Sequence, residues 1–258
     1  MAEIVLSVRR PEVQFVRAEI QKKTGLVYCL DGLPKTGKTR FALTMPGPIV
    51  IHDFNAGLDG VIDPFIEAGK EIYPFTYEIP LSRDLSKDFA TNLMESSKKS
   101  WETFAENFLA SLKHGNSIVI DLGSEAWELV RLARFGKLDK VMAIQYGAVN
   151  VEFRQLTQRA LRSGKNVAFL HKLKPEYKND QKTGELERQG FGDIGFDVEA
   201  TLRSGRDPKI KTVDQFSVTI EENRKNFKAN GLALTGEKAT FQNIAMAIYP
   251  DSKVEDWQ

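Results

Sequence analysis

The sequence contains a single cysteine, Cys29, among its 258 residues. An intramolecular disulfide and a multi-cysteine zinc site are therefore excluded. Cys29 lies in the apolar run 26–30, which predicts a buried strand residue rather than a reactive thiol. No apolar run reaches the roughly 20 residues that a membrane-spanning helix needs. Residues 1–10 lack the basic-then-apolar order of a signal peptide, so we expect a cytoplasmic protein without a membrane partner.

The chain also lacks an excess of charge of either sign. Its 36 lysines and arginines nearly cancel 35 aspartates and glutamates, and the formal net charge is +1. We therefore do not expect this protein to bind nucleic acid through an overall positive charge. A local basic patch stays open, because net charge says nothing about how the charges are distributed.

The hydrophobic pattern divides the chain into two parts. Residues 1–24 alternate apolar and polar side chains around Pro11, which predicts an N-terminal β extension of two short strands. In residues 25–258, apolar runs alternate with helical patterns, which predicts one α/β domain with a mainly parallel central sheet flanked by helices. We expect strands in 26–30, 48–53, 117–121, 166–171, 199–203 and 216–220, and helices near 38–43, 98–113, 151–161 and 240–248, with another after residue 121.

The most informative motif is a glycine-rich loop after the first predicted strand. Its sequence matches G-x-x-x-x-G-K-[ST], the phosphate-binding loop of nucleoside triphosphatases. The glycines let backbone amides converge on phosphate oxygens, the lysine contributes a positive charge, and the last hydroxyl coordinates magnesium. The predicted nucleotide-binding residues are Gly32, Leu33, Pro34, Lys35, Thr36, Gly37, Lys38, Thr39 and Arg40.

A second feature of such a site is a carboxylate at the end of a buried strand. Asp121 ends the run Ile118–Asp121 and would hold magnesium together with Thr39. An aspartate at a strand end also serves as a simple helix cap, so this assignment depends on the glycine loop. Asp53 and His171 end two other predicted strands, and ligands of parallel sheets bind beyond these carboxyl ends.

The order of these motifs resembles the RecA-like P-loop ATPases, in particular short phage-associated members linked to recombination and single-strand annealing. The resemblance covers residues 26–225 and rests on four segments: Gly32–Thr39, Ile49–Asp53 followed by Gly57-Leu58-Asp59, Ile118–Asp121, and Asn166–His171 with the long loop after it. It implies ATP and Mg²⁺ as cofactors, ATP hydrolysis, and a homo-oligomer acting on single-stranded DNA with phage or host recombination proteins, in the host cytoplasm if the protein is phage-encoded.

The resemblance also assigns roles to individual residues. Asn55 aligns with the glutamate that activates the attacking water, and asparagine can orient water but cannot accept its proton. Either Asp53 substitutes for it, or hydrolysis is slow. Lys38 acts on the outer phosphates, and His171 is a candidate sensor of the outer phosphate, unless backbone groups alone satisfy it. Arg224 is a candidate to reach the nucleotide of a neighbouring subunit, although it also fits an exposed turn.

The polar segment 172–195 carries four glycines and predicts a long loop or a flexible hairpin. By resemblance it is the DNA-contacting segment, in which cations would meet phosphates and the aromatic residues Tyr177 and Phe191 would stack on bases. A solvated mobile loop fits the composition equally well, because acidic residues dilute the charge. The predicted nucleic-acid contacts are Lys172, Lys174, Tyr177, Lys178, Lys182 and Arg188.

Three alternative functions remain open from the sequence. The same loop occurs in small-molecule phosphotransferases, although no arginine-rich lid is recognisable here. Asn55 would also suit an ATP-gated assembly subunit without catalytic activity, and a DNA motor is a variant of the preferred function.

Overall fold

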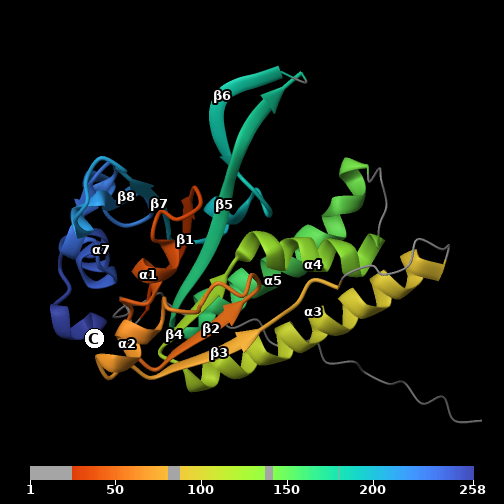
Figure 1. Ribbon diagram of the computed structural model, residues 1–258, viewed down its shortest axis with the longest axis horizontal. Coiled ribbons are helices and arrows are strands. Elements are labelled where there is room, and N and C mark those ends of the chain that lie inside the picture. The colour runs from red at the N-terminus through yellow and green to blue at the C-terminus, as the bar shows by residue number, and fades with distance from the viewer. Residues whose placement is uncertain (1–24, 81–87, 137–141, 180) are drawn as a thin grey trace, which may run out of the picture.

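The computed structural model describes residues 25–80, 88–136, 142–179 and 181–258 (Figure 1). The N-terminal β extension predicted for residues 1–24 lies outside these ranges. Among the described helices, none is long and apolar enough to cross a membrane.

A single twisted sheet forms the centre of the described structure, with the strand order β3-β2-β4-β5-β1-β7-β8-β9. The strands from β3 to β7 are parallel, whereas β8 and β9 continue the sheet in antiparallel pairing, and β6 pairs only with β5. Their bounds are Val27–Gly32 (β1), Ile49–Asp53 (β2), Ile72–Thr76 (β3), Ser117–Asp121 (β4), Asn166–Lys178 (β5), Gln181–Arg188 (β6), Ala200–Arg206 (β7), Phe216–Asn223 (β8) and Ala233–Thr235 (β9).

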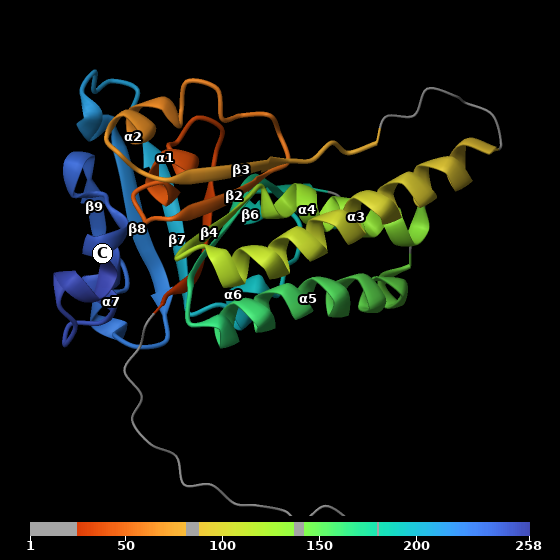
Figure 2. The ribbon, with the colours of Figure 1, turned by 90° about the horizontal axis from the view of Figure 1, so that it is seen from below.

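Helices cover both faces of this sheet (Figure 2). The long helices α3, α4 and α5 lie side by side on one face, and α1 and α7 pack on the other. The predicted α/β fold with a mainly parallel sheet flanked by helices is therefore confirmed. The helices are Lys38–Ala42 (α1), Asp63–Glu67 (α2), Asp88–His114 (α3), Gly123–Phe135 (α4), Tyr146–Ser163 (α5), Ile194–Asp197 (α6) and Phe241–Ile248 (α7).

The two cores follow from the alternation of side chains along each strand. In β1, Tyr28 and Leu30 face α1 and α7, whereas Val27 and Cys29 face the three long helices. All four side chains are at most 1% exposed. Cys29 is therefore a buried strand residue, as predicted, and its burial raises the pKa of its thiol to about 12.

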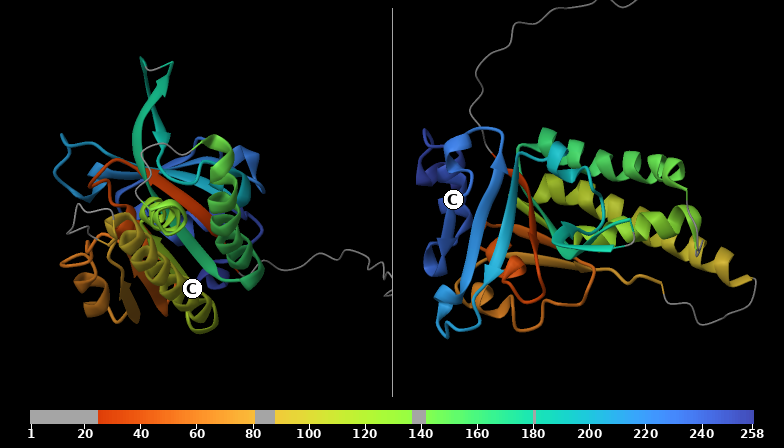
Figure 3. Two further views of the ribbon diagram at one scale, coloured as in Figure 1. Left: turned by 90° about the vertical axis from the view of Figure 1, so that its right-hand side faces the viewer. Right: turned by 90° about the horizontal axis from the view of Figure 1, so that it is seen from above.

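The strand β5 is twice as long as its predicted core and leaves the sheet. Its first six residues are buried, and the remainder pairs with β6 to form a two-stranded hairpin that projects from the body (Figures 1 and 3). The segment that the sequence predicts as a long loop or flexible hairpin therefore forms a two-stranded hairpin, with a register shift between Pro175 and Tyr177, followed by the short helix α6.

Some elements were missing from the sequence prediction. The edge strand β3 was overlooked because four of its five residues are exposed and it contains Pro74, so it shows no buried run. The short elements α2 and β9 were also missed, and α3 starts ten residues before the predicted start at residue 98.

Candidate nucleotide-binding site

The glycine loop joins β1 to α1 at the carboxyl edge of the sheet. Gly37 has φ +85°, a left-handed conformation that glycine adopts without strain. At Gly32 the constraint is space, because an added Cβ would lie 2.0 Å from Oγ of Ser204 and 2.6 Å from Oγ1 of Thr36. These two hydroxyls lie 2.7 Å apart and connect the loop to β7. The loop backbone is therefore shaped by close contacts that exclude larger side chains, as a phosphate cradle requires.

Lys38 and Thr39 occupy the first turn of α1 and point into the same space. The ammonium of Lys38 donates to the carbonyl oxygens of Gly32 at 3.0 Å and Leu33 at 2.9 Å. Partial burial lowers the pKa of Lys38, and the nearby carboxylates of Asp121 and Asp31 act in the opposite direction. A phosphate oxygen would offer this ammonium a charged acceptor in place of the two neutral carbonyls.

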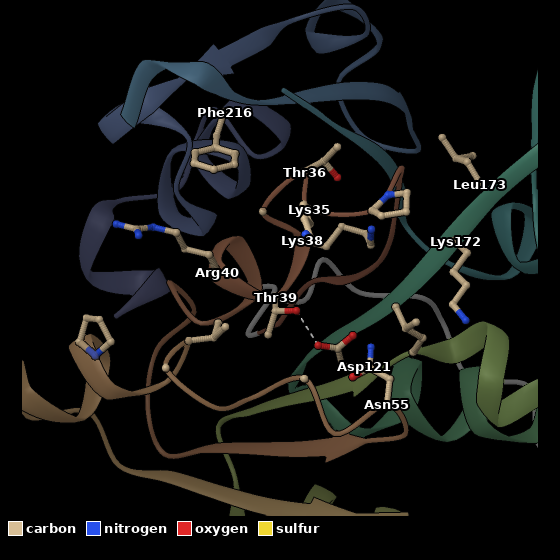
Figure 4. A pocket seen from close by; sticks show the side chains of 17 residues that line it. Lys35, Thr36, Lys38, Thr39, Arg40, Asn55, Asp121, Lys172, Leu173 and Phe216 are labelled. Atoms are coloured by element: carbon tan, nitrogen blue, oxygen red, sulfur yellow. Dashed lines mark hydrogen bonds between the residues drawn. The ribbon is translucent and has the colours of Figure 1, made fainter. Parts of the chain in front are cut away.

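Asp121 meets Thr39 at the floor of the site. Oγ1 of Thr39 donates to Oδ2 of Asp121 at 2.6 Å, so the structure brings together the two predicted magnesium-binding residues (Figure 4). Asp121 is 2% exposed, and its burial raises its pKa to about 6. Hard oxygen donors of this kind suit Mg²⁺. No cluster of three or more His, Cys, Asp or Glu side chains could hold a metal ion in the described ranges, so nucleotide and water would complete this site.

A cavity of about 710 Å³ opens above these residues, a volume in the range of small-molecule sites. Figure 4 shows Asp121, Asn55 and Lys172 toward one end, and Arg40 and Phe216 toward the other. Phe216 packs close to Gly37 and is a lining residue that sequence reasoning missed. The lining comprises the loop residues 34–40 with Asn55, Gly57, Gly60, Val61, Pro64, Asp121, Leu122, Lys172, Leu173 and Phe216.

Asn55 and Asp53 differ in their access to this cavity. Asn55 lines it, at the position where the resemblance expects a catalytic glutamate. Asp53 is 2% exposed, is absent from the lining, and its carboxylate accepts hydrogen bonds from the backbone amides of Asn55 at 2.9 Å and Gly57 at 3.2 Å. Asp53 therefore shapes the loop after β2, and the geometry gives no support to its predicted role as the base.

The comparison with protein families agrees with this arrangement. A family model described as an AAA domain matches residues 24–192, well over half of the chain. The chain belongs to this AAA-domain family. A solved structure of a KaiC-like protein from the hyperthermophilic archaeon Pyrococcus horikoshii OT3 is 14% identical, covers 78% of this chain and 80% of its own, and has a TM-score of 0.41. No curated protein matches the sequence.

The topology of this AAA domain matches the predicted RecA-like P-loop fold. The glycine loop follows β1, Asp121 ends β4, and β5 lies between these two strands. The chain therefore has an AAA domain with a phosphate-binding loop, arranged as in the RecA-like P-loop fold.

The sequence predicted that His171 reaches the nucleotide and that Lys172 contacts DNA. The structure places Lys172, and not His171, in the lining of the cavity. The His171 side chain is fully buried on the α4 side of the sheet, where its Nδ1 lies 3.2 Å from the carbonyl oxygen of Gln189 and its Nε2 has no partner. Burial lowers its pKa to about 4. His171 is absent from the cavity lining, so its role as a sensor of the outer phosphate stays a prediction. Lys172, predicted as a DNA contact, lines the cavity instead.

The predicted DNA-binding residues separate into two groups. Lys174, Tyr177, Lys178 and Lys182 lie on the projecting hairpin and are exposed. The ammonium of Lys174 lies 3.2 Å from Glu187, and that of Lys178 lies 3.1 Å from Glu176, so part of the positive charge is locally balanced.

Arg188 and Phe191 face inward, which corrects their predicted roles. Arg188 donates two hydrogen bonds to the buried carboxylate of Asp31, at 2.7 and 2.8 Å. Phe191 is 1% exposed and packs against Phe153, so it cannot stack on a base. Both residues fasten the base of the hairpin to the domain.

Arg224 lies at the opposite end of the sheet from the glycine loop. It follows β8, whose last residue Asn223 pairs with Ala200, whereas the loop begins at the other end of β1. Its guanidinium donates to the carbonyl oxygen of Phe196. Arg224 therefore cannot serve the cavity of its own chain, and its action on a neighbouring subunit remains a prediction.

Proposed function

We propose that this protein is a magnesium-dependent ATPase that acts on single-stranded DNA in recombination, annealing or repair. The proposal of nucleotide binding rests on the contact between Thr39 and Asp121 at the floor of the cavity, directly below the phosphate-binding loop. A buried carboxylate beside a hydroxyl and a lysine is the set of groups that a magnesium–triphosphate complex requires.

The residues of the site have separate tasks in this proposal. Lys38 binds the outer phosphates, and the amides of the glycine loop orient the phosphate chain. Thr39 and Asp121 would hold magnesium, which neutralises charge on the transferred phosphoryl group. Asn55 lines the cavity and can orient the attacking water by hydrogen bonding, but its amide cannot take the proton. We therefore expect slow turnover in the absence of a stimulating partner.

The DNA half rests on the hairpin of β5 and β6. Its strand β5 also lines the nucleotide cavity through Lys172 and Leu173, so one strand connects the site to the hairpin. Tyr177 is 55% exposed on this hairpin, beside the cations Lys178 and Lys182. Exposed aromatic rings among cations suit the bases and phosphates of a single strand. Further copies of the chain and phage or host recombination proteins are the other partners that we propose.

ATP turnover with and without single-stranded DNA tests this function. We expect DNA to stimulate turnover, and Lys38→Ala to abolish it. The variant Tyr177→Ser/Lys178→Gln/Lys182→Gln should bind single strands more weakly and with a smaller dependence on salt, because fewer phosphates are neutralised. Intact protein without salt-dependent affinity for single strands would refute the DNA half.

The hairpin variants are preferable to a deletion of residues 172–195. That deletion would also remove the buried side chains of Phe191 and Ile194 and the pair between Arg188 and Asp31. A loss of DNA binding could then reflect unfolding. Substitutions at exposed hairpin positions leave these interior contacts in place.

Asn55 also favours a second function, an ATP-gated binding protein without significant turnover. Neither Asp53 nor Asp121 is placed as a general base, because the carboxylate of Asp53 accepts hydrogen bonds from loop amides and that of Asp121 accepts one from Thr39 at the predicted magnesium position. This alternative predicts tight ATP binding with turnover equal to that of Lys38→Ala. Replacing Asn55 by glutamate should then increase turnover without a comparable change in ATP affinity.

A further inference from the structure

Lys172 is the cation that enters the nucleotide cavity from the strand next to the phosphate-binding loop. It lies directly beside Gly32 in the register of β5 and β1, at the point where the loop begins. It lines the cavity at the end that holds Asp121 and Asn55, as Figure 4 shows. Lys172 and Lys38 therefore both line the space where the phosphates would bind.

The ammonium of Lys172 is paired with the carboxylate of Glu125. Glu125 lies in the first turn of α4, which begins two residues after Asp121. The side chain of Lys172 is 44% exposed and that of Glu125 is 17% exposed, so the ion pair is partly exposed and its carboxylate is the more buried partner. The next lysine of the strand, Lys174, pairs instead with Glu187 on the hairpin and is absent from the cavity lining.

The position of the magnesium-binding residues orients a nucleoside triphosphate in the cavity. Thr39 and Asp121 would hold the magnesium ion that accompanies the outer phosphates of such a ligand. The terminal phosphate would then lie at the Asp121 end, near Lys172, and the nucleoside would extend toward the end that Arg40 and Phe216 line. A diphosphate lacks the group that would reach Lys172.

We propose that Lys172 binds the terminal phosphate of the triphosphate and that Glu125 holds its ammonium when that phosphate is absent. This inference rests on the proposed nucleotide-binding function. Binding of a triphosphate exchanges one anionic partner of Lys172 for another, whereas a diphosphate leaves the pair with Glu125 intact. The pair thus distinguishes the two nucleotides, and Glu125 opposes triphosphate binding.

Equilibrium binding of ADP and of the non-hydrolysable analogue AMP-PNP, both with magnesium, tests this assignment. Lys172→Met should weaken AMP-PNP binding by about tenfold or more, since a hydrogen bond to a charged group is lost, and leave ADP binding unchanged. Glu125→Gln should have the opposite effect and tighten AMP-PNP binding by about two- to fivefold, the range of a partly exposed ion pair. Its ADP affinity should equal that of the wild type.

Lys174→Met is the matched control, because it removes a lysine from the same strand without touching the cavity. It should leave both affinities unchanged. Equal weakening of ADP and AMP-PNP in Lys172→Met, or no weakening of either, would overturn the inference, as would weaker AMP-PNP binding in Glu125→Gln. A wild-type protein that binds neither nucleotide would instead refute the proposed function and this inference with it. Thermal unfolding of each variant separates these outcomes from misfolding.

Discussion

Replacing Asp121 by asparagine should stabilise the fold while it impairs the site. Burial raises the pKa of this carboxyl from 3.8 to about 6, the hydrogen bond from Thr39 acts against this rise, and the charge of Asp53 adds to it. A shift of this size corresponds to about 3 kcal/mol between the two protonation states. The carboxylate is 2% exposed, so solvent screens this cost little.

The stabilisation should depend on pH in a defined direction. The folded protein holds the proton of Asp121 up to about pH 6, whereas the unfolded chain releases it near pH 3.8. Between these values the wild type loses stability as pH rises, and Asp121→Asn does not. The variant should therefore exceed the wild type by up to about 3 kcal/mol in the free energy of unfolding above pH 6, and the gain should shrink on acidification.

Urea denaturation between pH 5 and pH 8, in EDTA and without nucleotide, measures this difference. Comparing the two proteins at each pH removes the contributions of other groups that they share, including the buried His52, whose pKa burial lowers to about 3. Asp251→Asn, at an exposed position, should show no such gain. A variant that is less stable than the wild type at pH 8, or a difference that is constant over the range, would refute the reasoning. The same variant should bind AMP-PNP with magnesium more weakly than the wild type does.

Two further substitutions test the packing around the site. Gly32→Ala places a Cβ 2.0 Å from Oγ of Ser204. It should lower the free energy of unfolding, measured by urea denaturation, by about 1–3 kcal/mol and weaken nucleotide binding. In the control Gly147→Ala in α5, the added Cβ meets no atom within 4 Å, so this variant should be neutral or stabilising. Arg188→Gln removes both guanidinium hydrogen bonds from the carboxylate of Asp31, which is 1% exposed and would keep only the guanidinium of Arg203 at 3.9 Å. This variant should lower the free energy of unfolding by about 3 kcal/mol. Lys182→Gln, on the exposed hairpin, should change it by less than about 0.5 kcal/mol. An unchanged denaturation midpoint in Arg188→Gln would contradict the structural role assigned to that pair.

The sequence alone was sufficient for the features that depend on neighbouring residues. The glycine loop is one contiguous motif, and the buried strands β1, β2 and β4 appear as short apolar runs because both faces of a parallel sheet are covered. The strand Ser117–Asp121 has the predicted bounds, and the meeting of Thr39 with Asp121 follows from the common carboxyl edge of the sheet.

Only the tertiary structure decided where the polar side chains of β5 and β6 point. His171 and Lys172 are adjacent in the chain, yet side chains of a strand alternate between its faces, so one is buried beside α4 and the other enters the cavity. Likewise, Arg188 is one of several cations in a polar segment, and its direction depends on Asp31, which is distant in sequence and is brought close by the packing of the hairpin. Phe216 reaches the cavity because β8 runs antiparallel to β7 and starts beside the loop. Composition predicts which groups are available, whereas strand register and direction determine which of them face the nucleotide.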